Sequence, residues 1–114
     1  MNVDVVMSQI IVADADRAVT FYTTLFGRGP DAKPMDKLHE WHFERAGAVQ
    51  VYEEPERAGA SGVTLHLVDL DAACAALDRA GIDHEPVVDA TFVRVVQLED
   101  PDRNRVVLTG AKSR

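Results

Sequence analysis

Two polar side chains lie in otherwise apolar segments of the chain, His66 and Gln50. Side chains at alternate positions of a strand line one face, so His66 shares a face with Gly62 and Thr64. An imidazole there can bind a ligand by a hydrogen bond or act as a general base, or it can be a pocket-lining group satisfied by a neighbour. The amide of Gln50, on the same face as Tyr52, can orient a ligand or bond a neighbouring side chain.

The segment 38–45 alternates two sets of side chains, and the sequence does not decide which set faces inward. One set is His39, Trp41 and Phe43, and the other is Glu40, His42 and Glu44. If Trp41 faces inward, it offers a stacking surface for an aromatic or cationic ligand; otherwise it is a core residue. The second set has a spacing that can bind a metal, but solvated edge residues are the favoured interpretation.

Other reactive side chains have simpler interpretations. Cys74 is the only cysteine, so it makes no internal disulfide, and its place on an apolar helical stripe predicts a buried, inert thiol. A single cysteine without zinc-type spacing also indicates a reducing, cytoplasmic location. We expect His84 to be exposed, and Glu53 and Glu54 to belong to a solvated linker rather than to an acid–base pair.

Charge and hydropathy narrow the class of protein. The chain has 114 residues, which suits one domain over 1–114, and 46% hydrophobic residues, which suffice for a core. A net charge of −7 disfavours nucleic acid as a partner, and would suit a cationic ligand or simply solubility. The sequence contains no apolar run of membrane-spanning length, and residues 1–6 do not resemble a signal peptide. We therefore expect no membrane partner.

The sequence repeats itself at an offset of 55 residues. Asp14-Ala15-Asp16-Arg17-Ala18 matches Asp69-Leu70-Asp71-Ala72-Ala73, and each match follows an apolar run and precedes a glycine, Gly27 or Gly81. An offset near half the chain length indicates two copies of one unit. We place the first copy at about 1–54, a linker at 55–61 and the second copy at 62–114.

Each copy has the pattern of a strand, a helix and further strands. In the first copy, Asp14 is the expected N-cap of a helix that ends at Gly27. The predicted strands are 3–12, 38–45 and 48–53 in the first copy, with a loop at 28–37 and a turn at Ala46-Gly47. In the second copy they are 62–68, 82–88, 91–99 and 104–109, with a helix at 70–80. The predicted class is α+β, with two β-α-β-β-β modules forming a curved mixed sheet, helices outside and a concave face for a ligand.

Three motifs in this order resemble the vicinal oxygen chelate superfamily, which includes glyoxalases, bleomycin-resistance proteins and extradiol dioxygenases. The first runs from Val12-Ala13-Asp14 to Leu25-Phe26-Gly27, the second from Asp69-Leu70-Asp71 to Ala80-Gly81, and the third is Asp100-Pro101-Asp102-Arg103-Asn104. The resemblance implies paired β-α-β-β-β modules and a homodimer, without fixing a reaction. Arg103 stands where the family turn has glycine, which predicts an altered turn in which Asn104 takes the unusual backbone conformation.

The resemblance also locates the four positions that hold a metal in metal-using members. They fall on Met7, Gln50, Gly62 and Val107. A divalent metal of this kind needs nitrogen or oxygen ligands, and only Gln50 supplies them. We therefore expect no metal and no cofactor.

Three functions are consistent with the sequence. The favoured one is a metal-independent binder of a small organic molecule, cationic or aromatic, held in the concave face. The alternative is a glyoxalase- or dioxygenase-like enzyme, a lyase, isomerase or oxygenase with an atypical or absent metal site, for which His66 is the candidate acid–base group. The third is an interaction domain that uses only the dimer. The candidate ligand-binding residues are Gln50, His66, Trp41, Tyr52, Met7, Gln9 and Thr64.

Overall fold

The computed structural model describes residues 1–45 and 47–112. Its first half contains β1 (Met7–Val12), α1 (Ala15–Phe26), β2 (Ala32–Met35), β3 (Leu38–His42) and β4 (Ala48–Glu53). A short 3₁₀ helix, Pro55–Arg57, leads to the second half, with β5 (Gly62–His66), α2 (Leu70–Ala80), β6 (Val88–Asp89), β7 (Val93–Glu99) and β8 (Arg105–Ala111). The β-α-β-β-β order therefore occurs twice, and the predicted α+β class is confirmed.

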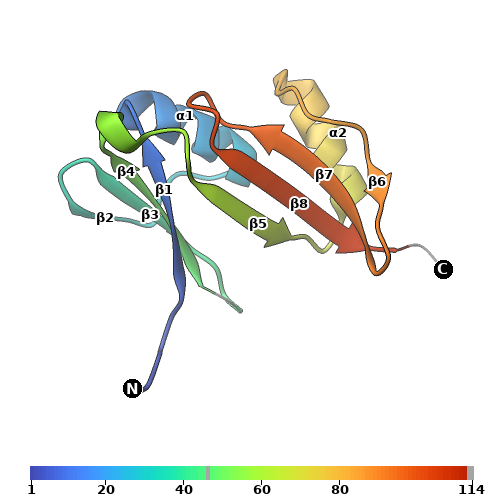
Figure 1. Ribbon diagram of the computed structural model, residues 1–114, viewed down its shortest axis with the longest axis horizontal. Coiled ribbons are helices and arrows are strands. Elements are labelled where there is room, and N and C mark those ends of the chain that lie inside the picture. The colour runs from blue at the N-terminus through green and yellow to red at the C-terminus, as the bar shows by residue number, and fades with distance from the viewer. Residues whose placement is uncertain (46, 113–114) are drawn as a thin grey trace.

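Hydrogen bonding divides the strands into two four-stranded mixed sheets. The first has the order β1-β4-β3-β2 and the second the equivalent order β5-β8-β7-β6. In each, the first strand pairs in parallel with the last, and the other pairings are antiparallel. The two sheets lie beside each other, and residues 1–6 extend away from the body (Figure 1).

Both helices begin and end as the sequence predicts. The side chain of Asp14 accepts a hydrogen bond from Arg17 N at 3.1 Å, and Asp69 accepts one from Ala72 N at 2.9 Å. Such side chains satisfy backbone N–H groups that have no partner in the first helical turn. Each helix ends at a glycine in the left-handed conformation. Within the described residues, no helix is long and apolar enough to cross a membrane.

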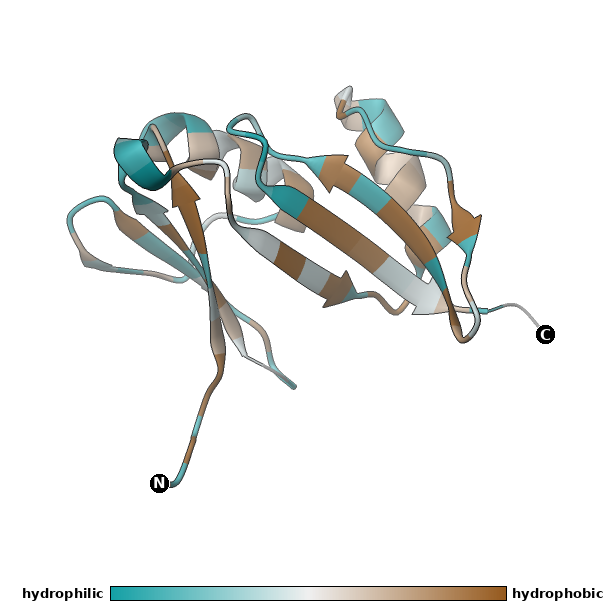
Figure 2. Ribbon diagram, viewed as in Figure 1, coloured by the Kyte–Doolittle hydropathy of each residue, from teal (hydrophilic) through white to brown (hydrophobic). Residues whose placement is uncertain are grey.

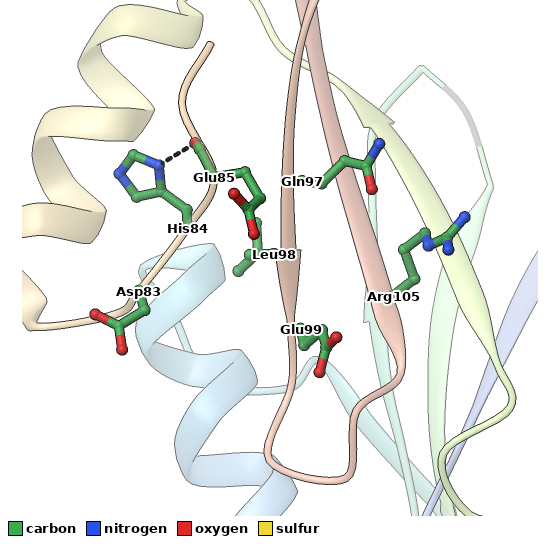
Figure 3. A pocket seen from close by; sticks show the side chains of 7 residues that line it. All are labelled: Asp83, His84, Glu85, Gln97, Leu98, Glu99 and Arg105. Atoms are coloured by element: carbon green, nitrogen blue, oxygen red, sulfur yellow. Dashed lines mark hydrogen bonds between the residues drawn. The ribbon is translucent and has the colours of Figure 1, made fainter. Parts of the chain in front are cut away.

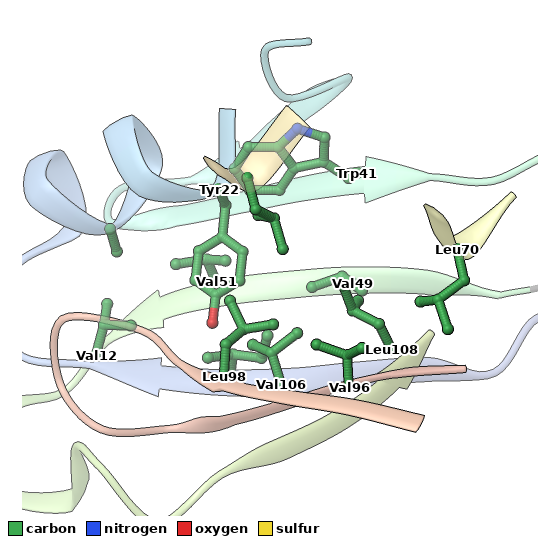
Figure 4. Packing of buried hydrophobic residues seen from close by; sticks show 13 residues of the cluster. Val12, Tyr22, Trp41, Val49, Val51, Leu70, Val96, Leu98, Val106 and Leu108 are labelled. Carbon is green, nitrogen blue, oxygen red and sulfur yellow. The ribbon is translucent and has the colours of Figure 1, made fainter. Parts of the chain in front are cut away.

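One apolar core joins the two halves of the chain (Figure 4). Apolar and polar residues alternate along β5 (Figure 2), and its Val63 and Leu65 pack against the core. Trp41 is fully buried in this core, with its ring centroid 6.2 Å from that of Tyr22 and 5.4 Å from that of Phe26. Its indole N–H donates to Arg28 O at 2.9 Å. Of the two interpretations of Trp41, that of a core residue is correct. Its side chain therefore does not lie on the face of the first sheet that is turned away from α1.

Several predicted boundaries differ from the structure. The strand predicted at 3–12 begins only at Met7. The predicted loop at 28–37 contains the edge strand β2. Of the strand predicted at 82–88, only Val88 lies in a strand, β6 (Val88–Asp89). Residues 82–87 still run beside β7, where Glu85 N donates to Gln97 O at 2.8 Å. The predicted turn includes Ala46, which lies outside the described residues.

The turn between β7 and β8, residues 100–104, contains no glycine. Arg103 itself adopts φ 70°, whereas Asn104 does not have a positive φ, so the predicted transfer of strain to Asn104 is wrong. Asn104 is instead buried, and its amide donates to Ile11 O at 2.8 Å and to Asp100 Oδ2 at 2.9 Å. These bonds keep Asn104 in an ordinary conformation and leave the strained position to exposed Arg103.

Two polar groups expected in solvent have defined partners. Glu53 accepts a hydrogen bond from Ala15 N at 2.9 Å and pairs with Lys37 Nζ at 2.9 Å, so it supports the start of α1. The His84 side chain is only 15% exposed and bonds Asp78 Oδ1 and Glu85 O, each at 2.8 Å. Both expectations of simple solvation are therefore wrong. Cys74 is half-buried, and burial raises the pKa of its thiol, in keeping with an inert group.

Candidate binding cleft

A polar row crosses the face of the first sheet that is turned away from α1. The register pairs Gln50 of β4 with Gln9 of β1 on one side and with Glu40 of β3 on the other. Ile10, Val12, Trp41, Val49 and Val51 have the opposite parity and fill the core. The open face of this sheet therefore carries amides and a carboxylate, not only apolar groups.

Glu40 is the centre of this row. It is only 7% exposed, and its two carboxylate oxygens accept hydrogen bonds from Gln50 Nε2 at 2.6 Å and from His42 Nε2 at 2.9 Å. The bond from Gln50, followed by that from His42, lowers the pKa of Glu40 despite its burial. Glu40 is therefore an ionised acceptor with two fixed donors.

The open face of the second sheet carries the other predicted imidazole. The register places Thr64 beside Val107 and His66 beside Thr109, on one face of β5 and β8. Thr64 and His66 are exposed, and His66 Nδ1 lies 2.9 Å from Thr109 Oγ1. Because a hydroxyl both donates and accepts, this contact does not fix which nitrogen of His66 carries the proton.

A cleft of about 910 Å³ lies between the two halves of the chain, where the end of β3 and residues 43–45 face β5. Its apolar lining residues are Phe26, Phe43, Leu65 and Leu67, and its polar ones are Arg28, His42, Glu44, Arg45, Thr64 and His66. A hollow that combines apolar walls with polar groups is the usual make-up of a small-molecule site. This cleft is the candidate binding site.

Aromatic rings and a guanidinium form one wall of the cleft. The Phe26 and Phe43 rings meet edge to face with centroids 5.4 Å apart. The Arg28 guanidinium lies 5.6 Å from the centre of the Phe43 ring and is held by Asp31 at 2.6 Å and by His42 O at 2.6 Å. The wall is therefore held in place by contacts within the first half of the chain.

The predicted ligand-binding residues divide among different places. His66 and Thr64 line the cleft. Met7 lines a neighbouring hollow of about 320 Å³, which also reaches His42. Gln50 and Tyr52 are half-buried on the open face of the first sheet, and Gln9 is exposed there. Trp41 is absent from this face, as described above.

The sequence prediction missed most of the cleft lining, including His42 and Phe43, and it missed Glu40, which bonds His42. The spacing of Glu40 and His42 can bind a metal, but it favours solvated edge residues. Only the strand register shows that Glu40 faces Gln50 and is covered. Phe43 belongs to one of two alternating sets, and the sequence does not decide which set faces inward.

A further hollow, of about 360 Å³, lies beside β7 on the second sheet (Figure 3). Asp83, Glu85 and Glu99 line it together with Arg105, while His84 turns toward α2. None of the sequence-predicted site residues lines this hollow. Its acidic lining is consistent with an ordinary solvated surface.

The structure places the four family metal positions on the two open faces. The register aligns Met7 with Ala48, two residues before Gln50, and aligns Val107 with Thr64, two residues after Gly62. Met7, Gly62 and Val107 carry no nitrogen or oxygen in their side chains. In the described part of the chain, no three histidine, cysteine, aspartate or glutamate side chains gather as a metal site. Glu40, His42 and Gln50 do converge, but their polar atoms bond one another.

The fold agrees with the comparisons. The chain belongs to the glyoxalase/bleomycin resistance protein/dioxygenase superfamily, whose family model matches residues 3–108. It resembles the crystal structure of a glyoxalase/bleomycin resistance protein from Catenulispora acidiphila DSM 44928, with 27% identity, a TM-score of 0.86, and 95% of this chain and 98% of that chain covered.

Two more distant structures share the fold alone. The antibiotic binding protein TnmS3 from Streptomyces sp. CB03234 has 22% identity and a TM-score of 0.83, with 97% of this chain and 98% of that chain covered. Lactoylglutathione lyase from Agrobacterium tumefaciens has 17% identity and a TM-score of 0.78, with 94% and 92% covered. No curated protein sequence matches this chain. One fold thus serves both binding and catalysis among these proteins.

Proposed function

We propose that this chain is a small-molecule-binding protein that holds an organic ligand with an aromatic or cationic part in the cleft between its halves. The observation that carries the proposal is the cleft itself, in which aromatic and aliphatic side chains meet two imidazoles. Apolar walls supply binding energy, and a few polar groups orient the ligand. The antibiotic-binding activity in the name of TnmS3 supports the same class of function.

Within this proposal, the ligand binds without a metal. Met7, Gly62 and Val107 supply no ligand atoms at the positions that the family uses. Hydrogen bonds must then orient the ligand, and His66 and Thr64 are placed to make them. Elemental analysis of tag-free protein should find well under one metal ion per chain. A stoichiometric metal that survives dialysis would contradict metal independence.

An enzyme remains the second candidate, because Glu40, His42 and Gln50 converge with nitrogen and oxygen donors. A metal ion held there would take the place of the hydrogen bonds between these side chains. Zinc or nickel titration tests the metal-dependent form of this candidate. Micromolar binding that is lost in Glu40→Gln would favour the enzyme, whereas the binder predicts no tight uptake.

We further propose that the protein is a homodimer in a reducing, cytoplasmic compartment. The open faces of both sheets include exposed side chains, and apolar residues 3, 5 and 6 of the N-terminal segment are exposed as well. A second copy would cover such surface and hide sheet edges. Sedimentation should give twice the mass of one chain, and a monomer at micromolar concentration would contradict the dimer.

The binding proposal is tested by screening cationic and aromatic compounds for thermal stabilisation, since a ligand of the folded state raises the midpoint. For a ligand that stabilises the protein, calorimetry should show weaker binding to His66→Ala. If the ligand buries the hydrogen bond, the loss should be about 5- to 150-fold. Arg79→Ala, at an exposed position of α2, is the control and should bind as the parent does. A broad screen without any stabilising compound would contradict the proposal.

A further inference from the structure

The contact between His42 and Glu40 fixes the proton on one nitrogen of the imidazole. Glu40 is ionised, because two hydrogen bonds lower its pKa, and an ionised carboxylate only accepts hydrogen bonds. His42 Nε2, 2.9 Å from Glu40 Oε1, must therefore carry the hydrogen. In the neutral imidazole this leaves Nδ1 as a lone-pair acceptor.

The carboxylate that fixes this proton is itself held in place. Its other oxygen accepts from Gln50 Nε2 at 2.6 Å, across the register pair of β3 and β4. Glu40 is 7% exposed, so both of its bonds are largely sheltered from solvent. Charge-assisted hydrogen bonds of this length are strong and directional. His42 is thus oriented by a chain of three side chains on two paired strands.

His42 lies at the candidate binding cleft and can still accept a hydrogen bond. Its side chain is 49% exposed and lines the cleft of about 910 Å³ together with Phe43 and Leu65. Among residues 1–45 and 47–112, its Nδ1 has no hydrogen-bond partner. An acceptor beside aromatic and aliphatic walls suits a flat apolar ligand that carries one acidic hydrogen.

We propose that His42, with its tautomer fixed by Glu40, is the hydrogen-bond acceptor that selects hydroxyl-bearing aromatic ligands in the cleft. The aromatic hydroxyl donates to Nδ1, and the ring lies against Phe43 and Leu65. His66 differs, because its contact with the Thr109 hydroxyl allows either tautomer and so allows it to donate or accept. This inference rests on the proposed small-molecule-binding function and adds a ligand class and a positioning residue to it.

The tautomer can be measured without any ligand. Long-range ¹H–¹⁵N correlation spectra at about pH 8.5, above the ordinary imidazole range, should show His42 protonated on Nε2. The isosteric Glu40→Gln variant removes the obligate acceptor, so its His42 signals should move toward a mixture of tautomers. Protonation of His42 on Nδ1 in the parent protein would overturn the inference, whatever the outcome of ligand screening.

The ligand class is tested with 2-naphthol and its methyl ether, 2-methoxynaphthalene, which differ in one donated hydrogen. We expect the parent to bind 2-naphthol about 5-fold more tightly or better, the low end for one buried hydrogen bond. His42→Phe keeps an aromatic ring and should abolish the preference, whereas Arg79→Ala should keep it.

The outcomes separate this inference from the function on which it rests. Equal binding of both probes, or binding of other library compounds while neither probe binds, overturns the hydroxyl-aromatic class and leaves the binding function intact. A preference for 2-naphthol that survives in His42→Phe overturns the role of His42 alone. A library without any ligand overturns the binding function, and with it the ligand class.

Discussion

At the scale of single residues, Arg103 has a strained backbone conformation in the turn where adjacent Asn104 makes buried hydrogen bonds. It adopts φ 70° in the β7–β8 turn, where Arg103 N donates to Asp100 O at 2.9 Å. Its side chain is exposed and makes no hydrogen bond to the described residues. We expect Arg103→Gly to stabilise the protein by about 0.5–1 kcal/mol, because glycine adopts this conformation without a steric penalty. Urea denaturation measures the change.

Lys37 provides the matched control for this prediction. It also has a positive φ, 64°, but its Nζ pairs with Glu53 Oε2 at 2.9 Å. Lys37→Gly relieves a similar strain and loses that contact, so it should stabilise the protein less than Arg103→Gly does. A larger gain at position 37 than at 103 would show that backbone strain does not dominate either change.

His84 gives stability a dependence on pH with a definite sign. Bonds to Glu85 O and then to Asp78 raise its pKa, so the folded state favours the protonated imidazole. This contribution is complete below the ordinary imidazole pKa of about 6.5 and disappears as pH rises through the higher folded value. The stability difference between the parent and His84→Gln should therefore shrink from acidic to alkaline pH. A difference that stays constant across that range would contradict the assignment.

Strand parity alone did not predict which side chains of β3 face the core. Trp41 and Glu40 are adjacent in sequence, and their side chains lie on opposite faces of β3. The alternating pattern offers two choices, and each set contains a histidine, so the sequence does not decide which set faces inward. What decides is packing against Tyr22 and Phe26 of α1, which is a contact across the chain.

At the scale of elements, a carboxylate from β4 stabilises the start of α1. Glu53 accepts from Ala15 N and pairs with Lys37, whereas adjacent Glu54 pairs with exposed Arg57. Exposed ion pairs contribute little, while a negative charge near a helix N-terminus is favourable. Glu53→Ala should lower the thermal midpoint clearly more than Glu54→Ala. Equal shifts would mean that the contact with α1 has no special weight.

Elements with strong local signals were predictable, and those without them were not. The aspartate caps, the terminal glycines and the 55-residue repeat give both helices and the doubled β-α-β-β-β order. Strand β2 was missed because it is an edge strand with Pro34 and exposed side chains, so its sequence resembles a loop. Edge strands are defined by their partner, here β3, more than by their own residues.

At the scale of the whole molecule, buried polar contacts join the two halves. Asn104 donates to Ile11 O at 2.8 Å, and Ser61 Oγ accepts from Ile11 N at 2.9 Å. The linker at 55–61 also packs closely against the β7–β8 turn, since a Cβ on Gly59 would lie 2.6 Å from Asp102 O. These partners are far apart in sequence, and no local pattern predicts them. The cleft is likewise a product of how the halves meet, which explains why sequence analysis found His66 and Thr64 but not their neighbours from the first half.

The Tyr22 hydroxyl tests whether these contacts hold the halves together. It donates to Asp100 Oδ2 at 2.9 Å inside the shared core, and burial followed by the charge of Asp100 raises its pKa. Tyr22→Phe removes one donor from a buried carboxylate and should cost roughly 1–3 kcal/mol.

Tyr52→Phe is the control, because Tyr52 is half-buried and its hydroxyl has no hydrogen bond to the described residues, so we expect a change below about 0.5 kcal/mol. Urea unfolding followed by tryptophan fluorescence, which reports the first half through Trp41, and by circular dichroism should give coincident transitions in the parent. If Tyr22→Phe is no less stable than Tyr52→Phe, the contact between Tyr22 and Asp100 does not contribute to joining the halves.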